Sequence, residues 1–314
     1  MNIAIILPCY NEEAVINESN NILVNMLDTL LNKQVIEGAA LIYVDDGSSD
    51  KTWKCINSLA CNSHSITKIH GVKLAHNSGH QNALIAGISR AYEERYDAIV
   101  TIDVDLQDDV NCIEQMVLLA KSGKEIIYGI RNARDTDTFF KRTTAHLFYR
   151  LMTKLGCDII YNHADFRLMT RNAVTALLQY KEHNLFLRGI VKSIGLPYSY
   201  VYYDRKERTA GITKYPLSKM INFAIEGITS FSTRPLRLIT FLGGACLIMA
   251  MILILFGLYS FFIGNTLPGW TSLMVSIWFV GGAIILALGV IGEYVGKIYQ
   301  EVKNRPRYFV ESQI

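Results

Sequence analysis

Two long apolar stretches near the C-terminus constrain the architecture of this chain more than any other feature. Residues 238–262 and 272–295 are apolar almost throughout, and Glu293 is the only charged side chain from the start of the first stretch to the end of the second. As a helix, the first stretch would be about 37 Å long, enough to cross the ~30 Å hydrocarbon core of a bilayer. Turn residues separate the two stretches: Gly264, Asn265, Pro268 and Gly269. The pattern predicts a transmembrane hairpin; the alternative is a buried helical pair in a soluble protein, but soluble helices rarely stay apolar all round over this length.

The charges beside the two stretches predict their orientation. Basic side chains lie before the first stretch and after the second, and the connecting loop carries no charge. The basic residues are Arg234, Arg237, Lys297, Lys303, Arg305 and Arg307. Because basic flanks stay in the cytoplasm, both termini are expected on that side. The N-terminal run IAIIL is too short for the apolar region of a signal peptide, so the long first part of the chain is expected to stay cytoplasmic as well.

Composition narrows the class of protein further. The 314 residues are 50% hydrophobic, which is ample for a sizeable core, and a formal net charge of +3 is too small to indicate a nucleic-acid partner. The cysteines are scattered, without a C-x-x-C pair: Cys9, Cys55, Cys61, Cys112, Cys157 and Cys246. This pattern favours reduced thiols in a cytosol-facing protein over a disulfide framework or a zinc site.

Ahead of the hairpin, short apolar runs alternate with helical patterns. The runs expected as strands are residues 3–7, 41–44, 69–74, 98–102 and 125–128, and the segments expected as helices are 12–31, 51–59, 79–92 and 110–119. Continuous apolar strands that alternate with helices are typical of an α/β fold with a mostly parallel sheet covered on both faces. In such sheets, ligands bind beyond the carboxyl ends of the strands.

Polar motifs follow three of the expected strands at their carboxyl ends. They are PCYNEE (residues 8–13), VDDGSSD (44–50) and DVDLQDD (103–109). Taken alone, DDGSSD is weak evidence, because Asp, Gly and Ser are ordinary turn residues and Asp50 is a typical cap for the helix that follows. The D-x-D of Asp103 and Asp105 is also common by chance. Together, the three motifs are more specific, because they bring carboxylates from neighbouring strands to one edge of the sheet.

Such a set of carboxylates suits transfer from a nucleotide diphosphate sugar. The leaving diphosphate is neutralised by a hard divalent cation such as Mg²⁺ or Mn²⁺, which binds carboxylate and amide oxygens. Asp103 and Asp105 would share one face of an extended strand end, and Gln107 continues that face. Asp108 and Asp109 are expected past the strand, where they would favour the positive end of the next helix. Neither a G-x-x-x-x-G-K-[ST] phosphate loop nor a G-x-G-x-x-G after the first strand is present, which disfavours P-loop and dinucleotide enzymes.

Taken together, the motifs resemble a known family. PCYNEE, VDDGSSD, DVDLQDD, YGIR, ADFRLM, FLRG, TAGITKYP, FSTRPLR, PGWTS and GEYVGKIYQEVKNRPRY are similar to motifs of the bactoprenol (undecaprenyl-phosphate) glucosyltransferases. These belong to the family 2 inverting glycosyltransferases and are similar to dolichyl-phosphate mannose synthases. The resemblance covers nearly the whole chain, and the tail and the PGWTS loop point to the polyprenyl-phosphate branch. It implies a GT-A fold, Rossmann-like with a mostly parallel sheet, followed by the two-helix transmembrane hairpin.

The resemblance also implies roles for residues on the donor side of the cleft. Residues that would bind the nucleotide sugar are Pro8, Tyr10, Asn11, Glu12, Asp45, Asp46 and Asp103. Asp103, Asp105 and Gln107 match the metal-binding D-x-D-x-Q of the polyprenyl-phosphate branch, with Mg²⁺ or Mn²⁺ as the cofactor. Asp105 is also counted among the catalytic residues.

On the acceptor side, Arg131 and Arg142 match basic positions that grip the acceptor phosphate and complete the catalytic set with Asp165. Asp165 and Arg167 fall where the family lines the sugar and acceptor side of the cleft. The chain departs from the family at Leu185, where many members have a basic residue before FLRG. A lipid phosphate is already an anion, so it needs orientation by cations more than a strong base, and Asp165 is expected to position first and to act as a base second.

Two basic segments favour contact with a lipid surface. Arginines from Arg131 to Arg150 are interleaved with aromatic residues, and residues 214–237 are expected to form an amphipathic helix on the bilayer. Arg208 and Lys214, near the start of the second segment, are expected as further acceptor contacts. A solvated charged face for the first segment and a plain linker helix for the second stay open as alternatives.

The histidines carry little of the prediction. His76 and His80 are four residues apart, but turn residues lie between them, so a helical metal pair is not expected. His163 is expected to make a local hydrogen bond beside Asp165.

The expected organisation has five parts. A cytoplasmic GT-A domain covers residues 1–213, a juxtamembrane amphipathic region 214–237, transmembrane helices 238–262 and 272–295, and a basic cytoplasmic tail 296–314.

The expected function is inverting transfer of glucose from UDP-glucose to undecaprenyl phosphate, at the cytoplasmic leaflet of a bacterial inner membrane. The product would serve modification of O-antigen or another surface glycan. Mannose, N-acetylhexosamine and aminoarabinose stay open as the transferred sugar, because a few hydrogen bonds set donor specificity. A processive polysaccharide synthase is disfavoured because its Q-x-x-R-W motif is missing, and a non-catalytic nucleotide-sugar-binding protein by the intact carboxylate set. Glycines in the hairpin offer surfaces for helix association, which leaves a homo-oligomer open.

Overall fold

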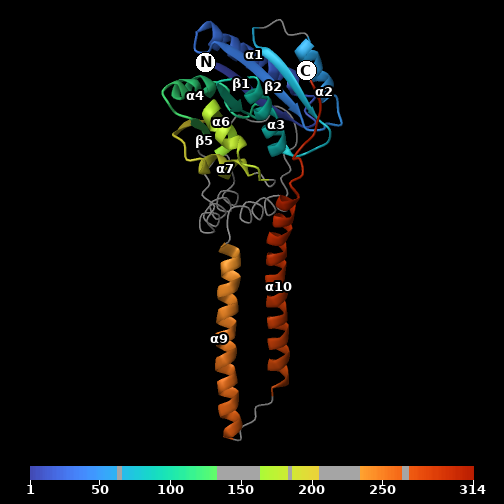
Figure 1. The fold of residues 1–314 in the computed structure, drawn as a ribbon, viewed down its shortest axis with the longest axis vertical. Coiled ribbons are helices and arrows are strands. Elements are labelled where there is room, and N and C mark those ends of the chain that lie inside the picture. Colours follow the sequence, from blue (N-terminus) through green and yellow to red (C-terminus); the bar gives the residue numbers. More distant parts are fainter. Residues whose placement is uncertain (62–65, 133–162, 183–185, 205–233, 264–268) are drawn as a thin grey trace. The chain divides into compact units, whose positions relative to one another are not determined.

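The computed structural model describes residues 1–61, 66–132, 163–182, 186–204, 234–263 and 269–314 (Figure 1). By its contacts, the chain divides into two units. The first holds all of the described strands, including one from the C-terminal segment Arg305–Ile314, and the second holds the two long C-terminal helices.

The first unit is built on one mixed sheet with the strand order β7-β5-β6-β4-β1-β2-β3-β8. The strands are β1 (Asn2–Cys9), β2 (Gly38–Asp45), β3 (Lys68–Leu74), β4 (Ala98–Thr101), β5 (Ile126–Arg131), β6 (His163–Thr170), β7 (Tyr198–Tyr203) and β8 (Val310–Gln313). Neighbours pair in parallel except where β6 meets β4 and β5 and where β8 meets β3. Among the described strands, therefore, β6 and β8 alone run against the others. The predicted mostly parallel sheet is confirmed.

Helices cover both faces of this sheet. They are α1 (Ile16–Asn32), α2 (Thr52–Cys61), α3 (His80–Glu93), α4 (Cys112–Lys121), α6 (Arg171–Leu178) and α7 (Leu187–Ser193). α1, α2 and α4 bury Leu23, Ile56 and Met116 in one core with Ile5 of β1. α3 packs against Ile6 on the other face of β1 and contacts α6. Because both faces are covered, every residue of β1 after its first is buried, which explains its continuous apolar sequence.

The second unit contains α9 (Arg234–Phe262) and α10 (Trp270–Lys303), which contact each other. Large apolar side chains are exposed along both helices, for example Phe241 and Leu288. Within the described residues, the segment Phe279–Lys303 is long and apolar enough to cross a membrane. Both apolar stretches are thus helical, and the candidate span overlaps the second predicted span, residues 272–295. The first predicted span, residues 238–262, stays a prediction.

The chain after α10 returns to the first unit as an edge strand. β8 pairs antiparallel with β3, and Gly71 and Ile314 exchange two backbone hydrogen bonds of 3.0 Å. Gly71 permits this approach, because an added Cβ would lie 2.8 Å from Ile314 Cγ1. Residues 296–314, expected as a basic tail, therefore hold the end of α10 and a strand that covers the edge of β3.

Deletion of residues 310–314 should unprotect this edge. The truncation removes both Gly71–Ile314 hydrogen bonds and the ion pair from Lys73 Nζ to Glu311 Oε1, which is 2.8 Å long. In hydrogen–deuterium exchange, peptides that contain Gly71 should exchange about tenfold faster or more than in the full chain, because the amide becomes open to solvent. Glu311→Gln is the matched control: it removes only the partly exposed ion pair, worth roughly 0–1 kcal/mol, and should leave exchange at Gly71 unchanged. Equal protection in the truncated and full chains would contradict the strand pairing.

Candidate functional site

The three polar motifs meet at one edge of the sheet, as predicted. β4, β1 and β2 are consecutive neighbours in the sheet and run parallel. The segments that follow these strands therefore begin side by side at their carboxyl ends. This edge is the place where an open α/β sheet binds its ligands.

The segments after β1 and β2 hold each other by hydrogen bonds. Asn11 Oδ1 accepts from the backbone N–H of Ser49 at 2.9 Å, and the N–H of Asn11 donates to Ser48 Oγ at 3.0 Å. Asp50 Oδ1 accepts from the N–H of Thr52, the first residue of α2, at 2.9 Å. Asp50 thus accepts a hydrogen bond at the start of α2, next to the cap position where it was expected. Asn11, predicted as a nucleotide contact, holds the segment after β2.

Asp45 and Asp46 are both buried but have different partners. The two carboxylate oxygens of Asp46 accept from the backbone N–H groups of Ser78 (2.7 Å) and Gly79 (3.0 Å), which fixes the approach to α3. Burial raises the pKa of Asp46, and these two hydrogen bonds oppose the rise. Asp45 Oδ1 accepts from the N–H of Ser48, whereas its Oδ2 has no hydrogen-bond partner among the described residues. A buried carboxylate oxygen without a partner is suited to accept a hydrogen bond from a ligand.

The other predicted donor-side residues of this region occupy different environments. Pro8 is buried at the end of β1, and Tyr10 is exposed. The backbone N–H of Glu12 donates to Thr52 Oγ1 at 2.9 Å, which adds to the contact between the two segments.

The segment after β4 is not extended, contrary to the sequence prediction. β4 ends at Thr101, and the chain then turns so that the N–H of Leu106 donates to Asp103 O at 3.2 Å. Leu106 has a φ of +47°, which an extended strand does not adopt. The argument that placed Asp103, Asp105 and Gln107 on one strand face was therefore wrong. Asp103 and Asp105 are partly exposed and Gln107 is buried.

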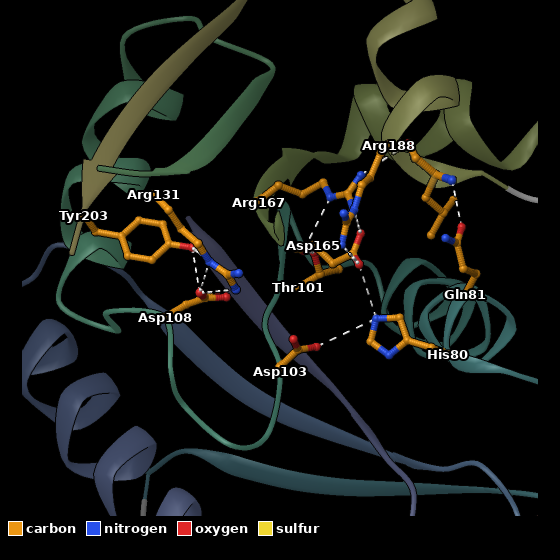
Figure 2. A network of polar contacts seen from close by, with 11 residues as sticks. His80, Gln81, Thr101, Asp103, Asp108, Arg131, Asp165, Arg167, Arg188 and Tyr203 are labelled. Carbon is orange, nitrogen blue, oxygen red and sulfur yellow. Dashed lines mark hydrogen bonds and ion pairs between the residues drawn. The ribbon is translucent and has the colours of Figure 1, made fainter. Parts of the chain in front are cut away.

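Asp108 and Asp109, which were expected to share one role, have different ones. Asp109 Oδ1 accepts from Asn111 Nδ2 at 2.9 Å beside the start of α4, so the helix-start prediction is right for this residue. It is wrong for Asp108, which is buried and whose Oδ1 accepts from Arg131 Nη2 (2.8 Å) and Tyr203 Oη (2.7 Å) (Figure 2). Burial lowers the pKa of Arg131, but Asp108 raises it overall. Through these two hydrogen bonds, Asp108 connects the segment after β4 to the ends of β5 and β7.

Asp165 of β6 is the centre of a second network (Figure 2). Its Oδ1 accepts from Arg167 Nη2 at 2.5 Å, and its Oδ2 accepts from Arg188 Nη2 at 3.0 Å and lies 3.5 Å from His80 Nε2. Burial raises the pKa of Asp165, but Arg188, His80 and Arg167 together hold it well below its ordinary value. Asp165 is therefore ionised at neutral pH, which suits a residue that positions cations better than one that takes up a proton.

The Asp165 network fastens α7 to the rest of the site. Arg167 Nη1 donates to Leu187 O at 3.4 Å, and Gln81 Oε1 of α3 accepts from the N–H of Leu187 at 2.8 Å. The side chain of Arg167 is 2% exposed and that of Arg188 is 28% exposed. Of the two arginines, Arg188 is thus the one with open surface, and Arg167 lies beneath it.

The surroundings of His80 and His163 differ from those expected from the sequence. His80, discounted as half of a metal pair, lies 3.8 Å from Asp103 Oδ1 as well as near Asp165, both distances measured from its Nε2. Burial lowers the pKa of His80, but the two carboxylates raise it overall. His163 was expected to form a local hydrogen bond, but neither ring nitrogen has a partner among the described residues. Its ring packs edge-on against Tyr128, with centroids 4.9 Å apart, and burial lowers its pKa well below the ordinary value.

The oxygen donors after β4 fit a divalent cation that is shared with a substrate. Within the described residues, no group of three His, Cys, Asp or Glu side chains is placed to hold a metal ion. Mg²⁺ commonly binds one or two protein carboxylates together with substrate phosphates, so a complete protein cage is not required. Asp103 and Asp105 are partly exposed hard donors of this kind, and Gln107 adds an amide oxygen. Partial desolvation, together with the carboxylates of Asp165, Asp108 and Asp105, raises the pKa of Asp103 to about 6, and a bound cation would oppose this rise.

Several predicted acceptor residues lie outside the described residues: Arg142, Arg208 and Lys214, together with Leu185. Of those described, Asp165 and Arg167 meet in one network, and Arg131 belongs to the separate Asp108 network.

Comparison with known proteins decides the family. Residues 4–178 match the model of glycosyl transferase family 2. The chain is a member of this family. The uncharacterized glycosyltransferase YkoT of Bacillus subtilis (strain 168) is 49% identical over 310 residues, 98% of this chain and 91% of that protein. The SfII prophage-derived bactoprenol glucosyl transferase of Shigella flexneri is 38% identical over 316 residues, 99% of this chain and 98% of that protein.

Among solved structures, glucosyl-3-phosphoglycerate synthase from Mycobacterium tuberculosis aligns with a TM-score of 0.45 and 18% identity, over 73% of this chain and 78% of that chain. Family 2 membership makes the chain a glycosyltransferase with a GT-A-like catalytic domain, and it confirms the resemblance found in the motifs.

Two residues of the site lie outside the segment that matches the family model. That segment ends at residue 178, so Arg188 and Tyr203 lie beyond it. Arg188 belongs to the FLRG motif, for which the sequence alone predicted no role. Nothing in the sequence signalled Tyr203, because its contact with Asp108 depends on how β7 pairs with β5.

Asp165→Asn should destabilise the family 2 domain more than Arg167→Met does. The first change leaves the buried guanidinium of Arg167 without its carboxylate, a loss of roughly 3–5 kcal/mol for buried pairs. The second leaves Asp165 paired with Arg188 and His80. Thermal unfolding in detergent at pH 7 should rank the variants in this order, and equal losses would contradict the network.

The difference in stability between wild type and Asp165→Asn should depend on pH. The folded pKa of Asp165 lies below the unfolded value, so its pairing stabilises the fold above about pH 4 and is lost as the pH falls through the folded value. The difference in unfolding temperature between wild type and Asp165→Asn should therefore narrow below about pH 4.

Proposed function

We propose that this glycosyltransferase moves a sugar, with glucose from UDP-glucose as the first candidate, onto undecaprenyl phosphate. One observation carries the proposal: partly exposed carboxylates and a partly exposed arginine lie at the same edge of the sheet, and the arginine is paired with a buried carboxylate. Asp103 and Asp105 represent the first, and Arg188 on Asp165 the second. The Shigella flexneri relative named a bactoprenol glucosyl transferase supports the lipid acceptor, because the two chains align over almost their full length.

On the donor side, the nucleotide is proposed to lie over the segments after β1 and β2. The unpartnered Oδ2 of Asp45 would accept a hydrogen bond from the ribose or the base. Asp103, Asp105 and Gln107 would hold Mg²⁺ or Mn²⁺, which when bound neutralises the charge that develops on the leaving diphosphate. Asp46 acts beneath this surface, because both of its oxygens hold the backbone before α3.

On the acceptor side, Arg188 is proposed to bind the lipid phosphate. Its side chain is partly open, and an arginine fork matches phosphate oxygens. Arg167 has its guanidinium buried against Asp165 and Leu187, so we assign it to holding Asp165 and the start of α7. Arg131 would keep the segment after β4 in place through Asp108.

The reaction is a single displacement. An oxygen of the lipid phosphate attacks the anomeric carbon, a carbon–oxygen bond forms, and the bond to the nucleoside diphosphate breaks, with the electron pair departing on the diphosphate. No proton has to be removed, because the lipid phosphate is an anion at neutral pH. Attack from the side opposite the leaving group turns an α-linked donor sugar into a β-linked product.

The acceptor requires access to a membrane. The exposed apolar surface of α9 and α10 and the candidate span Phe279–Lys303 support a membrane location. We propose that both apolar stretches span a bacterial inner membrane as a multi-pass hairpin, with the catalytic domain and both termini in the cytoplasm. The product would then be available for O-antigen or other surface-glycan modification.

The proposal is tested with the purified chain in liposomes that contain undecaprenyl phosphate, with Mg²⁺ or Mn²⁺. UDP-glucose, UDP-N-acetylglucosamine and GDP-mannose, each labelled in the sugar, are offered separately. A lipid-extractable sugar should form, most of all from UDP-glucose. The absence of lipid-linked sugar from every donor, or a polymer that forms without undecaprenyl phosphate, would refute the proposal.

Asp105→Asn should reduce turnover in this assay about 100-fold or more, because loss of one oxygen ligand weakens the charge stabilisation of the leaving group. Asp109→Asn, four residues away at the start of α4, is the matched control and should keep nearly full turnover. Both variants should insert into liposomes as the wild type does. Similar turnover of Asp105→Asn and wild type would remove Asp105 from the metal site.

A further inference from the structure

His80 lies at the site, although the sequence motifs gave it no role there. It is the first residue of α3, and its Nε2 lies 3.8 Å from Asp103 Oδ1 and 3.5 Å from Asp165 Oδ2 (Figure 2). Its side chain is 43% exposed, so a part of the imidazole is open to a ligand. One side chain thus bridges the carboxylate proposed for the donor side and the carboxylate that organises the acceptor side.

The backbone that carries His80 is held on both sides. Before it, the N–H groups of Ser78 and Gly79 donate to the buried carboxylate of Asp46 at 2.7 and 3.0 Å. After it, Gln81 accepts from the N–H of Leu187 at 2.8 Å. The start of α3, which carries the imidazole, is therefore anchored by neighbouring segments, as a group that recognises a ligand requires.

The reaction geometry locates the sugar between the same two carboxylates. An inverting displacement needs the leaving diphosphate and the incoming phosphate on opposite sides of the anomeric carbon. If the diphosphate lies at Asp103 and the acceptor at Arg188 beside Asp165, the sugar ring lies in the gap that His80 spans. This step rests on the proposed function.

We propose that His80 contacts the transferred sugar and determines which nucleotide sugars are accepted. An imidazole offers one N–H donor and one acceptor when neutral and two donors when protonated, and a sugar hydroxyl can pair with either form. A site built to hydrogen-bond a hydroxyl discriminates against a sugar that lacks it or presents it in another direction. His80 is in this respect a specificity-determining residue, in addition to its contacts with the two carboxylates.

The test compares His80→Ala and His80→Gln with wild type in liposomes that contain undecaprenyl phosphate. The donors are UDP-glucose, its C4 epimer UDP-galactose, and UDP-N-acetylglucosamine. In His80→Ala, the ratio of kcat/KM between the best and the second-best donor should fall about tenfold, since one hydrogen bond to a hydroxyl is lost. His80→Gln, which keeps an N–H donor, should retain more of the preference and serves if the alanine variant does not fold.

A binding measurement separates sugar recognition from a structural effect. Calorimetric titration with UDP alone and with UDP-glucose gives the gain in affinity that the sugar contributes. In His80→Ala this gain should shrink while the affinity for UDP stays the same. His76→Ala changes an exposed histidine four residues upstream and is the matched control for both measurements.

The outcomes distinguish this inference from the function on which it rests. Equal losses of kcat/KM for all donors, or loss of UDP affinity together with the sugar gain, would overturn the role of His80 and leave the proposed function standing. A wild type that forms no lipid-linked sugar from any donor would overturn the proposed function, and the role of His80 with it.

Discussion

A buried carboxylate is stable only with cationic or hydrogen-bonding partners, and Asp165 has three of them in one place. Arg167 lies beneath it, Arg188 beside it and His80 across from it. These partners come from β6, α7 and α3, so the pairing of one side chain fixes the relative positions of three elements. Without the ionised carboxylate, a fully buried guanidinium and a partly exposed one would repel each other at the same site.

The topology of the sheet places this network next to the residues proposed to bind the donor. β6 runs antiparallel between β4 and β5, so Asp165 near its start lies by the carboxyl end of β4, where Asp103 follows. The hydroxyl of Thr101, the last residue of β4, donates to Asp165 O at 2.5 Å, which joins the end of β4 directly to the start of β6. On the other side of β4, β1 and β2 supply Asn11, Asp45 and Asp46. The strand order thus places the residues proposed for the donor and those proposed for the acceptor on neighbouring parts of one sheet edge.

Much of this architecture could be predicted from the sequence. Strands such as residues 3–7, buried on both faces, have a continuous apolar pattern. The three strand-end motifs were correctly predicted to meet at one edge of the sheet. The prediction failed where long-range contacts override local pattern. The alternation in TIDVDLQDD suggested that the extended backbone and its shared face continue from the strand to Gln107. The chain instead turns at Leu106, and beyond the turn Asp108 pairs with Arg131 and Tyr203. β6 and β8 are antiparallel to their neighbours in the sheet. Their partners are distant in the chain, so the local pattern of apolar residues does not predict the pairing.

The central claim is that the diphosphate and the lipid phosphate lie on opposite sides of the transferred sugar, held apart by the Asp103 and Asp165 sides of the site. The anomeric configuration of the product reports this geometry directly. Wild-type protein in liposomes is given UDP-glucose labelled with ¹³C at the anomeric carbon, and the lipid-linked product is examined by the one-bond carbon–proton coupling. The account predicts a β-linked glucosyl phosphate, and an α-linked product would contradict it.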